Sequence, residues 1–269
     1  MDPRPLTATR LALALLSASR ETSLSANALV GAAELLGSSS NAMRVALSRL
    51  VASGDVELAS RGRYALSSSA LAPALHVRRF RTGFARRVAW RGDFVAVFTG
   101  DLPRRNPTSV RRRERALGLV GFRAFRHGVH VRPDNLEGGV DRVRSHLAEL
   151  GLDEEADVVT CRFDAAQQRA IEDLYVVTAD AARAADLDLR VRTLLARLEL
   201  TPTHRDAKES FFVGDEVLRF LARDPLLPSE LADPAPRLAL TSSMATLDER
   251  GHAIWQAVLD EFEAAKEAS

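Results

Sequence analysis

Two groups of arginines and a pair of aspartates are the residues of this sequence whose types and spacing suit chemistry on a ligand. The first group lies between Ser38 and Leu66, where Arg44 and Arg49 stand close together and Arg61 and Arg63 flank a glycine. A guanidinium group donates paired hydrogen bonds to phosphate and to guanine. This group therefore indicates a surface for nucleic acid, provided that the chain presents these side chains together.

An amphipathic helix is expected to position Arg44 and Arg49, starting at a serine cap, Ser39 or Ser40, and ending at Gly54. At about 100° per residue, its apolar face carries Met43, Ala46, Leu47, Leu50 and Val51. A solvated polar face is the ordinary explanation for the other side of such a helix. In a DNA-binding motif, however, that face reads base edges near the helix N-terminus. The expected DNA-contacting residues are Asn41, Arg44, Val45, Ser48 and Arg49.

Two shorter helices are expected before this one, over Leu6–Ala18 and Ala26–Leu36. Ser25 can cap the second of them, and a glycine follows it. Helix, helix, short turn and helix is the order of a helix-turn-helix domain, whose third helix enters the major groove of DNA.

A two-stranded hairpin is expected after the third helix. Short alternating stretches at 56–58 and 64–66 flank Arg61 and Arg63, and the glycine between these arginines suits the turn. A hairpin with a basic tip completes a winged helix-turn-helix. We expect Arg61 and Arg63 to contact the DNA backbone or the minor groove.

The second group of arginines comprises Arg104, Arg105, Arg111, Arg112, Arg113 and Arg115. These side chains could extend the DNA surface, bind the phosphates of a small-molecule effector, or solvate a helix. The residues assigned to effector phosphates are Arg111, Arg112 and Arg113.

Asp93 and Asp101 bracket an apolar stretch and could support a metal-dependent nuclease. A single carboxylate cannot both hold Mg²⁺ and orient a water molecule, although a dimer could supply a second carboxylate from the other subunit. An aspartate at the edge of a strand or in a turn is the simpler interpretation. We therefore assign no catalytic residue, no metal ligand and no resident cofactor, and keep the nuclease as the alternative function.

Residues 91–165 alternate between strand and helix patterns. Strands are expected near 93–100, 122–126, 129–132 and 157–163, with helices over 108–117 and 136–150. Asp134 or Asn135 can cap the second helix. Strand, helix, strand, strand, helix, strand is the order of a ferredoxin-like βαββαβ domain.

The expected architecture is α+β and multidomain. Four segments follow from the pattern: a winged helix-turn-helix domain over 1–67, a linker helix over 68–90, a ferredoxin-like domain over 91–165 and a helical C-terminal domain over 166–269. In the last segment an apolar stripe around Trp255 is expected to be core or subunit interface.

Charge is distributed unevenly along the 269 residues, whose net charge is +1. Residues 1–132 hold 22 Lys and Arg against 8 Asp and Glu, so this half carries +14. A polyanionic partner is favoured for it. Cys161 is the only cysteine, which excludes an intramolecular disulfide. No early apolar run reaches the roughly 20 residues that span a bilayer, so we expect a soluble, cytoplasmic protein with no membrane partner.

Three blocks of the sequence resemble the PaaX family of transcriptional repressors of phenylacetic acid catabolism. They are the helix segment 44–50, the segment 119–133 (LVGFRAFRHGVHVRP) and the segment 223–228 (RDPLLP). The resemblance implies a winged-helix domain, a ferredoxin-like middle domain similar to CRISPR-associated small nucleases, and a helical C-terminal domain. It also implies a homodimer that binds operator DNA and responds to an aryl-CoA or related acyl-CoA thioester, or another aromatic metabolite.

From the residues and the resemblance we expect a homodimeric, ligand-responsive transcriptional repressor rather than an enzyme. A protein-binding scaffold built on the same winged helix is a further class, and it would show little salt-dependent affinity for DNA.

Overall fold

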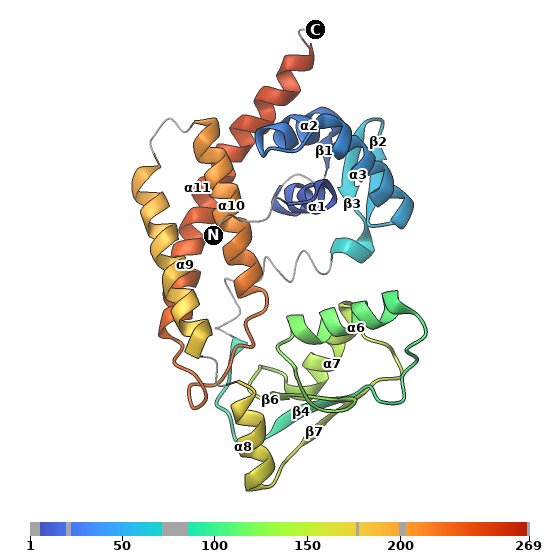
Figure 1. The fold of residues 1–269 in the computed structure, drawn as a ribbon, viewed down its shortest axis with the longest axis vertical. Helices are drawn as coiled ribbons and strands as arrows, with labels where there is room; N and C mark the ends of the chain where they lie inside the picture. Colours follow the sequence, from blue (N-terminus) through green and yellow to red (C-terminus); the bar gives the residue numbers. More distant parts are fainter. Residues whose placement is uncertain (1–5, 20–22, 72–85, 176–177, 199–202, 268–269) are drawn as a thin grey trace. The chain divides into compact units, whose positions relative to one another are not determined.

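The computed structural model describes residues 6–19, 23–71, 86–175, 178–198 and 203–267. In these ranges the chain has an α+β fold with two antiparallel sheets, and it divides into two compact units (Figure 1). Unit 1 comprises Met1–His76, Arg190–Val217 and Ser243–Ser269, and unit 2 comprises Val77–Leu189 and Leu218–Ser242. The segment predicted as a separate helical domain, 166–269, therefore contributes to both units.

Unit 1 begins with three helices and a three-stranded sheet. In chain order these are α1 (Ala8–Ala18), β1 (Leu24–Ser25), α2 (Ala26–Leu35), α3 (Ser40–Ser53), β2 (Val56–Ser60) and β3 (Arg63–Leu66). The strands lie in the order β1-β3-β2, and both pairings are antiparallel. The three helices and the hairpin occur where the sequence predicts them. β1 was not predicted, because two residues are too few to show an alternating pattern.

The ends of α2 and α3 are set by the predicted caps. Ser25 accepts a hydrogen bond from the backbone N–H of Ala28 at 3.1 Å, and Ser39 accepts one from Ala42 at 3.2 Å. Gly54 follows α3 in the left-handed conformation, with φ of 77°. Local sequence therefore determines the length of α3 and the position of its N-terminus.

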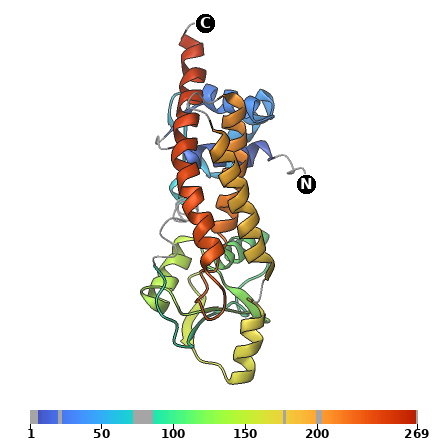
Figure 2. The same ribbon diagram turned by 90° about the vertical axis from the view of Figure 1, so that its left-hand side faces the viewer.

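The core of unit 1 joins α1–α3 to two helices from the other end of the sequence. These are α10 (His204–Leu221) and α11 (Ala235–Glu267), whose unit 1 portions lie side by side in Figures 1 and 2. Phe211 and Leu259 are buried in one cluster with Leu11, Leu29 and Leu47. The apolar stripe around Trp255 is thus core.

Unit 2 contains a four-stranded sheet with helices on both faces. Its elements are β4 (Phe94–Phe98), α6 (Pro107–Leu119), β5 (Arg123–Arg126), β6 (Val129–Pro133), α7 (Gly139–Glu149), β7 (Asp157–Cys161) and α8 (Ala165–Asp173). All neighbours in the order β5-β6-β4-β7 are antiparallel. The predicted order of strand, helix, strand, strand, helix, strand is confirmed. A further helix, α9 (Thr178–Arg197), follows and contributes residues to both units.

Alternate residues of β4 face different layers of unit 2. Val95 and Val97 pack with α6 and α7, whereas Phe94 and Ala96 pack with Ile171 of α8 and its neighbours (Figure 1). A strand that is covered on both faces shows an unbroken apolar run rather than an alternating one. This explains the continuous apolar sequence of β4.

The predicted cap of the helix over 136–150 is wrong. The helix α7 begins at Gly139, after Gly138 with φ of 82°, and no side chain caps it. Glycine adopts this conformation without strain, so the chain enters the helix through two glycines. Asn135 is instead fully buried, and its side chain serves another contact.

That contact is a hydrogen-bond network around the buried guanidinium of Arg132. The guanidinium donates to the carbonyl oxygens of Val120, Pro133 and Pro225 and to the side-chain oxygen of Asn135. Burial lowers the pKa of Arg132 to about 10, so the group remains charged at neutral pH. The network satisfies a charge that would otherwise be very costly to bury.

Two segments distant in sequence meet at Arg132. The side chain of Asn135 donates to the carbonyl oxygen of Leu226 at 2.7 Å, and Arg87 donates to that of Leu227 at 2.9 Å. A β-carbon added at Gly121 would lie 2.5 Å from the Cα of Pro225, so only glycine permits the approach. The segments 119–133 and 223–228, which carry the resemblance noted above, therefore pack against each other.

Replacing Arg132 by methionine should lower the free energy of unfolding of unit 2 by about 3 kcal/mol, because buried carbonyl groups lose their donor. Urea unfolding can be followed through Trp90, a unit 2 residue, in a Trp255→Phe background. The exposed Arg126→Met is the control and should change this free energy by less than about 0.5 kcal/mol. Equal effects of the two variants would contradict a stabilising role for the network.

Candidate nucleic-acid interface

The two faces of α3 have the exposure that the sequence predicts. Met43, Ala46, Leu47 and Leu50 are buried against the core of unit 1. The opposite side chains are exposed, including Val45 with 41% of its surface accessible. All of the predicted DNA contacts on this helix are exposed, namely Asn41, Arg44, Val45, Ser48 and Arg49. Helix packing thus presents all five on one accessible stripe.

The cations of this stripe are available to a ligand. Within the described ranges, the structure assigns no ion pair or hydrogen bond to the guanidinium of Arg44, of Arg49 or of the exposed Arg61. The sequence of α3 contains no acidic residue that could neutralise its arginines. An unpaired guanidinium pays no cost of breaking an internal contact when it binds an anion.

The two arginines of the hairpin have different surroundings. Arg61 lies in the exposed turn between β2 and β3, as predicted. Arg63 is partly buried and donates to the hydroxyl and the carbonyl oxygen of Ser23 at 3.0 and 2.8 Å. It also forms an ion pair with Glu263 of α11 at 3.3 Å. Sequence analysis did not find this pair, because its two members stand 200 residues apart and neither shows a local signal.

The arginines assigned to an effector also divide. Arg111 and Arg112 are exposed on α6. Arg113 is 5% exposed and makes a bidentate contact with Asp153, at 2.7 and 3.0 Å. It points inward because it lies on the α6 face that also buries Ala116 and Leu117. The structure therefore brings Arg111 and Arg112, but not Arg113, to the surface.

The aspartates weighed for a nuclease do not lie in a metal cluster. Asp93 forms an ion pair with Arg162, and that hydrogen bond lowers the pKa of Asp93. Asp101 is exposed in a turn. Among the residues that the structure describes, no three His, Cys, Asp or Glu side chains gather closely enough to hold a metal ion. No helix in the same ranges is both long and apolar enough to cross a bilayer.

Comparison with known proteins gives a structural likeness only. No protein-family model and no curated protein matches the sequence. The solved structure of an uncharacterized protein, Rv0674 from Mycobacterium tuberculosis, is similar with a TM-score of 0.54 and 23% sequence identity. The match covers 96% of this chain and 99% of that chain. At this identity the likeness concerns the fold.

The ion pair between Arg113 and Asp153 should make unit 2 sensitive to acid. Its hydrogen bond lowers the pKa of Asp153 below the usual value of 3.8, so the folded state binds fewer protons than the unfolded state in acid. The contribution is therefore fully present above about pH 4 and is lost as the pH falls through the lower folded-state pKa. We expect Asp153→Asn to cost about 2 kcal/mol at neutral pH.

Urea unfolding through Trp90, in the Trp255→Phe background, measures this difference between about pH 7 and about pH 3. The gap between wild type and Asp153→Asn should shrink toward the acid end. The exposed Glu154→Gln serves as the matched control on the same loop and should show no such gap. A gap that stays constant with pH would contradict the assigned role of the carboxylate.

Proposed function

We propose that the protein is a DNA-binding transcriptional regulator, a repressor of the PaaX type, in which α3 is the recognition helix of a winged helix-turn-helix domain. One observation carries this proposal: the exposed stripe of α3 joins two unpaired arginines to Asn41 and Ser48, whose side chains can hydrogen-bond to base edges. The order β1-β3-β2, with Arg61 exposed at the hairpin turn, supports the assignment of the hairpin as the wing.

The charge of the sequence supports a polyanionic partner. Residues 1–132 carry +14 in total, and α3 contains two arginines and no carboxylate. Neutralising phosphates with such cations releases counterions, which favours binding and makes it depend on salt. Cytoplasmic DNA is the partner that this chemistry fits.

The proposed regulator is a homodimer, as the resemblance implies. Two recognition helices related by a two-fold axis would read half-sites one or more helical turns apart, with about 10 to 10.5 base pairs per turn. For residues 91–165 we propose a ferredoxin-like domain, which the strand order β5-β6-β4-β7 and the alternation of strands and helices support.

The effector that we propose is an aryl-CoA or acyl-CoA thioester, a charged ligand with an apolar end. Arg111 and Arg112 are exposed on α6 and suit its phosphates. Arg113 contributes to such a site only by fixing α6 through Asp153, since its guanidinium is already bound.

Arg44→Ala should weaken binding to an operator duplex by about 1 to 3 kcal/mol, because a bidentate contact with guanine is lost. The operator is first selected from a random duplex library, and affinity is then measured by fluorescence anisotropy. Arg169→Ala removes the same charge from an exposed position on α8 and is the matched control. If Arg44→Ala leaves both the affinity and the selected sequence unchanged, Arg44 does not read bases.

The same duplex distinguishes the proposed function from its alternatives. Intact duplex recovered with and without Mg²⁺ supports a regulator, whereas Mg²⁺-dependent cleavage supports the nuclease. Binding that is weak and independent of salt would support a protein-binding scaffold instead.

A thioester effector should release the duplex. A coupling of about 1 to 3 kcal/mol corresponds to a 5- to 150-fold loss of affinity. Phenylacetyl-CoA is titrated against the complex of wild type, of Arg111→Ala with Arg112→Ala, and of the matched control Arg142→Ala with Arg169→Ala. Release should weaken only in the first double variant. Equal release of the duplex from all three proteins would mean that the phosphates of the effector bind elsewhere than at Arg111 and Arg112.

A further inference from the structure

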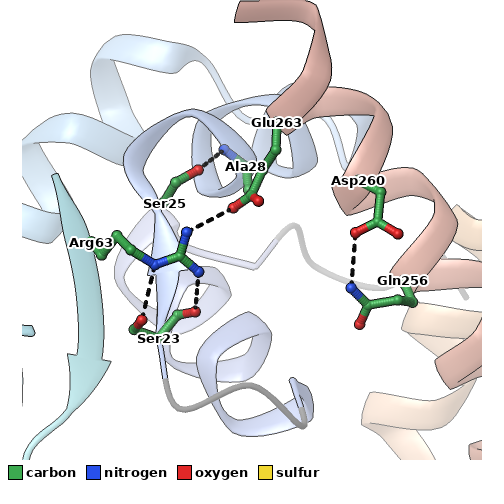
Figure 3. A network of polar contacts seen from close by, with 7 residues as sticks. All are labelled: Ser23, Ser25, Ala28, Arg63, Gln256, Asp260 and Glu263. Carbon is green, nitrogen blue, oxygen red and sulfur yellow. Dashed lines mark hydrogen bonds and ion pairs between the residues drawn. The ribbon is translucent and has the colours of Figure 1, made fainter. Parts of the chain in front are cut away.

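We propose that Glu263 is an internal competitor of DNA: its carboxylate occupies a phosphate-binding site at Arg63 and holds the affinity of the wing for DNA below its full value. This inference rests on the proposed function and adds a regulatory contact to it. The contact lies wholly within unit 1, between the start of β3 and the final turns of α11 (Figure 3).

The site is built around a guanidinium that is already oriented. Ser23 accepts from Nε of Arg63 through its hydroxyl and from Nη2 through its carbonyl oxygen. These two acceptors are neutral, and they leave Nη1 directed toward Glu263 at 3.3 Å (Figure 3). Among these described contacts, the carboxylate of Glu263 carries the negative charge, and a phosphate oxygen can replace it.

The position of Arg63 allows a DNA phosphate to replace the carboxylate of Glu263. It follows directly after the hairpin turn, and exposed Arg61 stands two residues earlier. Two residues of extended chain span at most about 7 Å, so both arginines can reach one stretch of DNA backbone. Of these two arginines, Arg63 has the carboxylate of Glu263 held against it, whereas the described chain assigns no ion pair to Arg61.

The ion pair is accessible enough to exchange. The side chains of Arg63 and Glu263 are 33% and 37% exposed. At such exposure water and salt weaken the attraction, so a pair of this kind stabilises little. A duplex that brings several phosphates to unit 1 can therefore displace the carboxylate at low cost.

Packing brings Glu263 to the hairpin. The preceding residue, Phe262, lies against Gly31 of α2, where an added β-carbon would lie 2.6 Å from the ring. Leu259, one turn earlier, is buried in the core that contains α1–α3. These contacts fix the end of α11 beside the hairpin, so the carboxylate stays near Arg63 whether or not DNA is bound.

The test compares operator affinity and its salt dependence in four proteins: wild type, Glu263→Gln, Arg63→Gln and the double variant. Glu263→Gln should bind about two- to fivefold more tightly. Its plot of log affinity against log salt should steepen by up to about 0.9, because Arg63 is no longer shared between the carboxylate and a phosphate. The double variant should lose this gain, and Arg63→Gln alone should bind no more tightly than wild type.

Asp260→Asn is the matched control. Asp260 lies on α11, about one turn before Glu263. Its side chain accepts a hydrogen bond from Gln256 at 2.9 Å rather than from Arg63 (Figure 3). Asp260→Asn removes one negative charge, as Glu263→Gln does, and therefore tests whether the loss of charge alone explains a gain of DNA affinity. A gain of the same size in both variants, or one that persists without Arg63, would overturn the proposal.

The outcomes separate this inference from the function on which it rests. A wild type that binds no duplex would remove the proposed function, and the inference with it. A wild type that binds duplex, with no gain of affinity and no change of salt slope in Glu263→Gln, would overturn the internal competitor alone.

Discussion

The docking of α10 and α11 against α1–α3 is the constraint on which the proposed interface depends. A domain of roughly 60 residues buries only about 60% of the surface that its unfolded chain exposes, so its core is marginal. In unit 1 the aromatic and aliphatic side chains of Phe211, Trp255 and Leu259 extend the core formed by the three helices. The free energy that orients α3 thus comes partly from residues about 200 positions away.

This packing also explains why one face of α3 is free. Met43, Leu47 and Leu50 are buried in the shared core, and the helix cannot rotate without exposing them. Its arginines therefore remain on the outer stripe. The same docked helix brings Glu263 to Arg63, so a single packing arrangement exposes some cations of unit 1 and neutralises another.

Arginines in this protein serve opposite purposes according to their neighbours. Arg44 and Arg61 are exposed, whereas Arg113 is paired with Asp153 and Arg132 is surrounded by carbonyl oxygens. A buried guanidinium is tolerated only where acceptors meet its donors, because desolvation of an unpaired charge is very costly. In unit 2 these acceptors come from segments far apart in sequence, including the carbonyl oxygen of Pro225.

The sequence by itself determined those features that depend on neighbouring residues. Serine caps, the terminal glycine of α3, its apolar spacing and the order of strands and helices in 91–165 act within a few residues of one another, and each was predicted. The exposed stripe of α3 follows from the same spacing. Tertiary structure alone decided which arginines are free, that Asn135 binds the carbonyl oxygen of Leu226 rather than capping a helix, and that 166–269 is divided between two units. Those outcomes depend on partners distant in sequence, and the pattern of a single segment contains no information about them.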